Sequence, residues 1–272
     1  MKRLLKIEWA KVSSYNLFRV ILILTAALFF LVVFVFSRID ISLPGFSWRN
    51  IFRYPNVWPS FAWVASWFNV LLAILVIVIT GNEFAHKTFR QQVMSGLSRN
   101  EWLIGKGILM IGLALFGLVL VILASLVSGF IFTKDLSFSL IFENSGVIIV
   151  YFIQAMSYMI LALLFTVSFR SNALSIILYL LYFIFIEPII RMFFQPPVRQ
   201  WFPVKILSHL TPRPEFLQLT SQSGNIDPAT LTFEELGLMP EQLSQSSTII
   251  MACVYISIFI CLIYFIVQKR DI

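Results

Sequence analysis

The sequence predicts an all-α polytopic membrane protein with six transmembrane helices. The chain of 272 residues is 59% hydrophobic and only 12% charged, whereas charged residues make up roughly a quarter of a soluble domain. Its apolar residues form six long runs, and about 20 such residues allow one helix to cross a bilayer core. The charges gather between these runs. Composition and spacing together exclude a soluble globular protein and a disordered chain.

The six predicted spans are bounded by charges, prolines and polar clusters. The first span follows basic residues, as a signal peptide does, but no small-x-small cleavage site comes after it, so we expect an uncleaved anchor. The fifth ends at Glu187-Pro188, and because proline cannot continue the helix hydrogen bonds we expect a short or interrupted span. We treat residues 1–272 as a single transmembrane domain. The spans are residues 17–36, 61–80, 108–132, 147–169, 173–190 and 248–267.

The distribution of basic residues predicts the orientation of the chain. With six spans both termini lie on one side, and Lys and Arg gather on the cytoplasmic side of a membrane. If the termini are inside, the inner segments carry twelve Lys and Arg against four acids, and the outer segments carry eight against nine. The net charge of +7 is therefore a sign of topology, and we expect no nucleic-acid partner. The prediction is cytoplasmic N and C termini.

Two inner stretches have amphipathic patterns. Residues 1–16 interleave basic and apolar side chains, which is typical of an interfacial helix; the alternative is a frayed basic tail. Between the second and third spans, Phe89, Val93 and Leu97 form one apolar stripe. Ser98 and Glu101 have the spacing of a capping box that would start the third membrane helix. We therefore expect a short helix, a break at Ser95-Gly96 and a new helix, with an ordinary inner loop as the alternative.

The extracytoplasmic segment 191–247 is not plainly polar. Its first half mixes apolar side chains with Pro196, Pro197 and Pro203. Such a mixture suits short re-entrant or interfacial elements that enter the outer leaflet and turn at the prolines. We expect these elements to precede the last span.

The sequence contains no recognisable catalytic or metal motif. The P-loop pattern G-x-x-x-x-G-K-[ST] and the zinc pattern H-E-x-x-H are both absent. His86 and His209 would lie on opposite sides of the membrane, and Cys253 and Cys261 are too far apart along one helix to bridge. We expect no catalytic residue, no metal and no cofactor on this chain.

The interiors of the spans are almost free of ionisable groups. A proton- or ion-coupled carrier would need such groups, because buried charges in membranes mark transport paths. The small residues at i, i+4 spacing in the third span are instead typical of close helix packing. These helix-packing residues are Ala124, Ser125, Ser128 and Gly129.

The inner segment between the second and third spans carries the most specific pattern. It contains Glu83-Phe84-Ala85-His86-Lys87-Thr88-Phe89-Arg90, then Ser95-Gly96-Leu97-Ser98-Arg99, and then Lys106. This resembles the ABC-2 (type V exporter-like) permease subunits of ABC transporters, in which an acidic residue is followed by a Thr, a Ser-Arg pair and a Lys that opens the third helix. The resemblance covers nearly the full length. The chain departs from it at Lys87 and Gly96, where the family often has Gly and Pro.

The resemblance implies a permease subunit of an ATP-driven exporter in the bacterial cytoplasmic (inner) membrane. Two permeases, identical or related, would pair among the membrane lipids, and each would dock an ABC ATPase subunit that binds ATP and Mg²⁺. An amphiphile, lipid-linked glycan, peptide or drug would be a more plausible substrate than a small ion. The implied ATPase-coupling residues are Glu83, His86, Lys87, Thr88, Arg90, Gln91, Ser98 and Arg99.

Two other functions stay open. The same fold could serve as the membrane anchor of an ATP-driven machine that does not itself translocate a solute, or as an ATP-independent carrier. An enzyme is not expected, because no paired acid, serine or metal constellation is present in the sequence.

Overall fold

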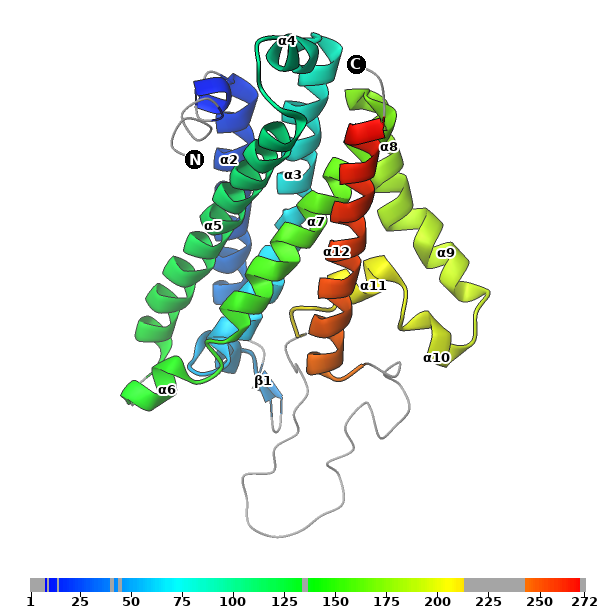
Figure 1. Ribbon diagram of the computed structural model, residues 1–272. Coiled ribbons are helices and arrows are strands. Elements are labelled where there is room, and N and C mark those ends of the chain that lie inside the picture. The colour runs from blue at the N-terminus through cyan, green and yellow to red at the C-terminus, as the bar shows by residue number, and fades with distance from the viewer. Residues whose placement is uncertain are drawn as a thin grey trace.

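The computed structural model describes residues 8, 10–13, 15–39, 42–43, 46–133, 137–212 and 243–269. Within them, six helices are long and apolar enough to cross a membrane (Figure 1). Each of the six predicted spans falls within one of these helices. The helix either has the bounds of the predicted span or extends beyond it at one or both ends. They are α2 (Asn16–Arg38), α3 (Val57–Ala85), α5 (Arg99–Phe132), α7 (Val147–Phe169), the composite α8–η2–α9 (Asn172–Met192) and α12 (Gln245–Lys269).

Short elements join the spans at the two ends of the bundle. A two-stranded hairpin and a 3-10 turn precede α3, and small helices follow α3, α5 and α9. They are β1 (Ser42–Leu43), β2 (Phe46–Ser47), η1 (Trp48–Phe52), α4 (Thr88–Met94), α6 (Phe138–Phe142), α10 (Pro196–Arg199) and α11 (Pro203–Ser208).

The centre of the bundle is formed by α3 and α7. These are the two most buried spans, whereas α2, α12 and the composite fifth helix leave most of their apolar residues exposed or only partly buried. Exposed apolar side chains along whole helices are unusual on a soluble surface but expected where lipid replaces water. In Figure 1, α2 begins and α12 ends at the end of the bundle that carries α4. The start of the first span and the end of the last span therefore lie at the same end of the bundle.

The fifth span continues through its proline by changing its helical type. It runs as α8 (Asn172–Leu181), then as a π-helical turn, η2 (Tyr182–Ile186), and then as α9 (Glu187–Met192). Because Pro188 has no N–H to donate, a local widening of the helix before it relieves the ring of its clash with the preceding turn. The predicted interruption is thus a change of helix type, and the helix does not stop there.

The predicted re-entrant element is α11, which packs between α7 and α12 (Figure 1). The side-chain amide of Gln154 donates to the carbonyl of Leu207 at 3.0 Å and its oxygen accepts from the hydroxyl of Thr211 at 3.0 Å. Gln154 lies about 10 Å along α7 from the start of that helix. The chain therefore returns into the bundle before the last span. Residues 213–242 of the predicted outer segment lie outside the described residues.

The carboxylate of Glu187 orients this re-entrant element. It accepts the backbone N–H groups of Val204 and Lys205 at 2.8 and 2.9 Å. These are among the first N–H groups of α11, which have no partner within their own helix. Glu187 is buried, so the pairing satisfies both the carboxylate and the helix start away from water.

Candidate functional site

The elbow, which we define as residues 81–106, connects α3 to α5 through α4. The turn at the end of α3 places Lys87 in the left-handed region with φ 56°, and the hydroxyl of Thr88 donates to the carbonyl of Glu83 at 3.2 Å. After α4, Gly96 has φ +97°, a conformation that costs glycine little because it has no Cβ. The elbow is a helix-turn-helix-turn-helix with locally specified breaks.

The predicted capping box at the start of α5 is confirmed. The hydroxyl of Ser98 accepts from the backbone N–H of Glu101 at 3.1 Å, and the carboxylate of Glu101 accepts from the backbone N–H of Ser98 at 2.8 Å. Each interaction satisfies a donor that the helix start would otherwise leave unpaired. The break before α5 and the first turn of that helix are therefore encoded locally.

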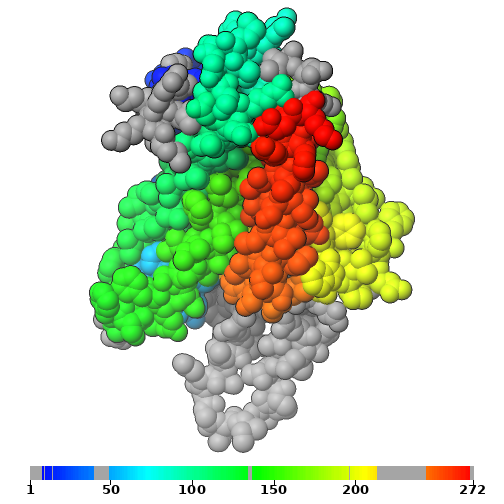
Figure 2. Space-filling model, viewed as in Figure 1, coloured from blue at the N-terminus to red at the C-terminus, as the bar shows by residue number. Residues whose placement is uncertain are grey.

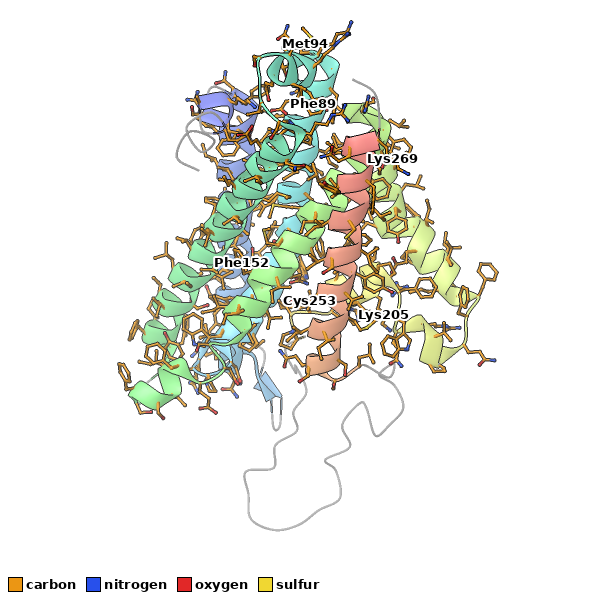
Figure 3. All side chains as sticks on the ribbon, in the orientation of Figure 1. Phe89, Met94, Phe152, Lys205, Cys253 and Lys269 are labelled. Carbon is orange, nitrogen blue, oxygen red and sulfur yellow. The ribbon has the colours of Figure 1, made fainter. Side chains whose placement is uncertain are left out.

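The apolar stripe of α4 seats this helix on the bundle. Phe89 is buried, and its ring lies 4.9 Å from the Trp102 ring and 5.4 Å from the Phe84 ring, centroid to centroid. Val93 and Leu97 pack against the same core. Figure 3 shows Phe89 on the bundle side of α4 and Met94 at its outer edge. The predicted apolar stripe of Phe89, Val93 and Leu97 therefore faces the bundle.

Beneath α4 lies a buried ion cluster made of Glu8, Lys11, Glu83 and Lys106. The ammonium of Lys106, which is fully buried, lies 2.8 Å from the carboxylate of Glu83 and 3.2 Å from that of Glu8. The ammonium of Lys11 lies 3.1 Å from each of the same carboxylates. Two anions and two cations alternate in this cluster, so its formal charge is zero.

Two neutral side chains complete the polar contacts of the ion cluster. The indole N–H of Trp102 donates to Glu83 at 2.6 Å, and the amide oxygen of Gln92 accepts from Lys11 at 3.2 Å. Buried charges are costly unless each is paired and hydrogen-bonded. In this cluster the carboxylate of Glu83 receives three donors, so the cost of burying it is offset by direct contacts.

The pKa of Lys11 shows the balance of forces in the cluster. Partial burial alone would lower the pKa of its ammonium, but the carboxylates of Glu83 and Glu8 outweigh burial, and the pKa is raised above its ordinary value. The charged form of Lys11 is therefore the stable one, and its ion pair with Glu83 joins the N-terminal segment to the end of α3.

The cluster joins segments that are distant in the sequence. Glu8 and Lys11 come from the N-terminal segment, where residues 10–13 are helical. Glu83 comes from the end of α3 and Lys106 from the second turn of α5. Val12 is also buried against the core. The described part of the predicted interfacial helix is thus packed on the bundle; Lys2, Arg3 and Lys6 lie outside the described residues.

Further contacts tie the elbow to the remaining helices. The amide of Asn82 donates to the hydroxyl of Tyr15 before α2 at 2.8 Å, and Asn172 at the start of α8 donates to Asn82. The guanidinium of Arg99 donates to the carbonyls of Val267 and Gln268 at the end of α12, at 2.9 and 2.6 Å. A displacement of the elbow would therefore be transmitted to α2, α8 and α12 as well as to α3 and α5.

The structure separates the predicted coupling residues into two groups. His86, Lys87, Arg90, Gln91 and Ser98 are exposed, and Thr88 and Arg99 are partly buried. The expectation that Glu83 lies on the exposed face is wrong: its side chain is buried in the ion cluster because Lys106 and Trp102 approach it from α5. The two sides of α4 thus have different surroundings: one side is open, and the other faces the bundle and the ion cluster.

The sequence interpretation missed Glu8, Lys11, Gln92 and Trp102 as parts of this site. One signal was available, because Glu8 is the only acid among the first sixteen residues. Lys106 is also the only charge between Glu101 and the end of the third apolar run. An isolated lysine in an apolar helix requires a counter-ion, and the lone acid of a basic segment is a candidate for it.

The small residues of α5 predicted to pack are all buried. Ala124, Ser125 and Ser128 lie within the chain, and a Cβ at Gly129 would meet the ring of Tyr54. In the part of the chain that the structure describes, no group of three His, Cys, Asp or Glu side chains is placed to hold a metal ion. Cys253 and Cys261 are free and exposed.

Comparison with known proteins gives one result. None of the curated proteins matches the chain. The sequence profile of one family matches residues 56–272, from the start of α3 to the end of the chain, and includes the elbow. On that match, which covers well over half of its length, the chain belongs to the family described as "Protein of unknown function (DUF2705)".

Proposed function

We propose that the chain is the membrane-spanning permease subunit of an ATP-driven ABC exporter, working as a dimer with a second permease. A separate ABC ATPase subunit would dock on the exposed side of α4. One observation carries the proposal: α4 is a short helix with one side seated in the bundle and the other side open, directly above a buried ion cluster.

The elbow has the properties of a lever. α4 joins the ends of α3 and α5 through turns of two to four residues, so a rigid shift of α4 must move both helices. α3 is one of the two central helices, and it contacts α2, α5, α7 and α8. The ion cluster and the ring contacts of Phe89 oppose a change in the angle between α4 and the bundle. A push on α4 would therefore move the bundle, with little bending of the elbow.

The open side of α4 also suits a protein partner. Met94 is 74% exposed, the largest exposed fraction of any apolar side chain in this elbow. It is flanked by the exposed Lys87, Arg90 and Gln91. An apolar centre with a polar and basic rim is typical of a protein interface. The expected partner surface has an apolar pocket with an acidic margin.

The proposed docking site requires the α4 end of the bundle to face the cytoplasm. The excess of Lys and Arg in the segments at this end favours that orientation. Both termini would then be cytoplasmic, and the α6 and α10 end would face outward. The bacterial cytoplasmic membrane is the expected location.

Co-purification tests the docking site. The tagged protein is extracted from native membranes in mild detergent, and co-purifying chains are identified by mass spectrometry and assayed for ATP hydrolysis. The test variant is Arg90→Ala with Met94→Ala, which changes exposed side chains only. The matched control is Arg38→Ala with Met192→Ala, at the opposite end of the bundle.

The proposal predicts that a P-loop ATPase is retained by the wild type and the control. The test variant should lose at least about tenfold of it, because truncating a hot-spot residue at the centre of an interface costs about 2 kcal/mol or more and a tenfold loss needs about 1.4 kcal/mol. Equal retention by the test variant and the wild type would show that α4 is not the docking site. Absence of any ATPase from the wild type under several mild extraction conditions would favour the ATP-independent carrier. An ATPase without vectorial transport in proteoliposomes would favour the anchor subunit.

A further inference from the structure

An apolar groove runs between α5, α7 and α12 in the half of the bundle nearest α4. Its volume is about 480 Å³. In Figure 2 it follows the seam between the green surface of α5 and α7 and the orange-red surface of α12. The side chains that matter for the argument are Leu103, Gly107 and Met110 of α5, Met156 and Ile160 of α7, and Ile263 of α12.

Gly107 lines the groove and leaves open space beside α5. Three other glycines of α5 are close to a neighbour: a Cβ at Gly105 would meet Glu8, one at Gly117 would meet Tyr151, and one at Gly129 would meet Tyr54. A Cβ at Gly107 would meet nothing within 4 Å. A side chain added at Gly107 would therefore enter the groove without meeting another described part of the chain.

The length of the groove and its place along α7 put it in one leaflet. Its α5 lining extends from Asn100 to Met110, which is about 15 Å along the helix axis. The hydrocarbon core of a bilayer is about 30 Å thick, so a groove of this length is shorter than one span. It begins at the level of the elbow, and its α7 lining, Met156 to Leu163, runs from about the middle of that helix toward its elbow end.

The size of the groove decides between the two apolar occupants available in a membrane. A helix about 10 Å across would occupy roughly 1,200 Å³ over 15 Å of length, far more than the groove offers. An acyl chain is much thinner and enters from the side, where Ile104 and Ile260 are exposed. We propose that the groove holds one acyl chain of a phospholipid from the leaflet on the α4 side.

The charges at the mouth of the groove favour an anionic headgroup. Arg99 and Lys269 lie at this end of α5 and α12, and the guanidinium of Arg99 donates to the carbonyls of Val267 and Gln268. The carboxylate of Glu101 accepts from the backbone of Ser98. Among the described residues at this end of α5 and α12, two cations stand against one already bound carboxylate, and such a balance attracts an anionic phosphate, as basic sites between membrane helices do.

Photo-crosslinking tests this inference without any need for a transport assay or an ATPase. The full-length protein is reconstituted in nanodiscs that contain phosphatidylglycerol with a diazirine near the end of one acyl chain. Crosslinks are mapped by mass spectrometry to Met110, Ile160 and Ile263, which are buried on the floor of the groove and accessible to lipid only through it. The compared proteins are the wild type, Gly107→Leu and Gly112→Leu.

The wild type and Gly112→Leu should label the floor of the groove equally, because a Cβ at Gly112 also meets nothing and Gly112 does not line the groove. Gly107→Leu should reduce this labelling at least fivefold while labelling of the exposed Ile23 on α2 stays unchanged. Gly107→Ala, with a smaller side chain, should give an intermediate yield and guards against a misfolded leucine variant. Equal floor labelling in Gly107→Leu and the wild type would overturn the proposal.

Two further outcomes separate the alternatives. If a bifunctional crosslinker joins the floor of the groove to a second copy of the chain, the occupant is protein and the lipid proposal fails. The headgroup is tested with the same probe on phosphatidylcholine. We expect at least threefold lower floor labelling with the zwitterionic lipid, and Lys269→Gln should reduce the difference. Equal labelling by both lipids would refute the anionic preference.

Discussion

The substitution Lys106→Met removes one of the two cations from the buried ion cluster. Methionine keeps the length and approximate volume of lysine, so the change acts mainly on charge. Glu83 would lose an ammonium at 2.8 Å and Glu8 would lose the same ammonium at 3.2 Å. Two buried carboxylates would then share Lys11, and the cluster would carry one uncompensated negative charge.

The expected cost is about 3–5 kcal/mol of unfolding free energy, the range found when one partner of a buried ion pair is removed. The second substitution Glu8→Gln should recover at least half of that loss. In the double variant Glu83 still contacts Lys11 at 3.1 Å and Trp102 at 2.6 Å, and one anion again faces one cation. The recovery measures the coupling between the N-terminal segment and α5 directly.

The measurement is a denaturant titration of the purified proteins in detergent micelles, followed by circular dichroism. Lys269→Met is the matched control, because Lys269 is exposed and surface substitutions usually change stability by less than about 0.5 kcal/mol. A cost for Lys106→Met no larger than that for Lys269→Met would refute the assignment of a stabilising cluster. Strict additivity of the two substitutions would refute the coupling.

Three further predictions concern other parts of the chain. Gly129→Leu should cost about 1–3 kcal/mol through overpacking against Tyr54, whereas Gly112→Leu should be close to neutral in the same denaturant titration. The pKa of Lys11 is raised on folding, so the stabilisation by its ammonium is present below the unfolded pKa of 10.5 and is lost as pH rises through the folded pKa. Lys11→Met should remove that part of the alkaline decline in stability. Identical stability-versus-pH profiles for the wild type and Lys11→Met would contradict this prediction. Gln154→Leu should leave the carbonyl of Leu207 and the hydroxyl of Thr211 without this partner and cost about 1–3 kcal/mol of unfolding free energy. The segment after α9 should then be cleaved faster by a protease. An unchanged cleavage rate would argue against the anchoring role of Gln154.

The spans could be predicted because their cause is local. A bilayer requires about 20 consecutive apolar residues with backbone hydrogen bonds satisfied within the segment, and both conditions can be read from a single stretch of chain. The same holds for the Ser98 and Glu101 capping box and for the stripe that begins at Phe89, since each depends on spacing of three or four residues. These features are independent of what the rest of the chain does.

The partner of each buried charge could not be predicted in this way. The resemblance implied a coupling role for Glu83, in which its side chain would face a docked ATPase. In the folded chain Glu83 instead binds Lys106 and Trp102, because the packing of α5 on α3 brings these side chains under α4. Tertiary packing overrode that expectation at the residue that matters most for the elbow.

By itself, the sequence determined that this protein is a six-span helical membrane protein with a capping box at the start of its third span, because hydrophobic length and helix-start chemistry are local properties. Only the tertiary structure decided which charges are buried together and where space is left between helices. Lys106 meets Glu8 across 98 positions of sequence, and the groove beside Gly107 is bounded by three separate spans. Such contacts depend on the angles at which helices cross, and no single stretch of sequence contains that information.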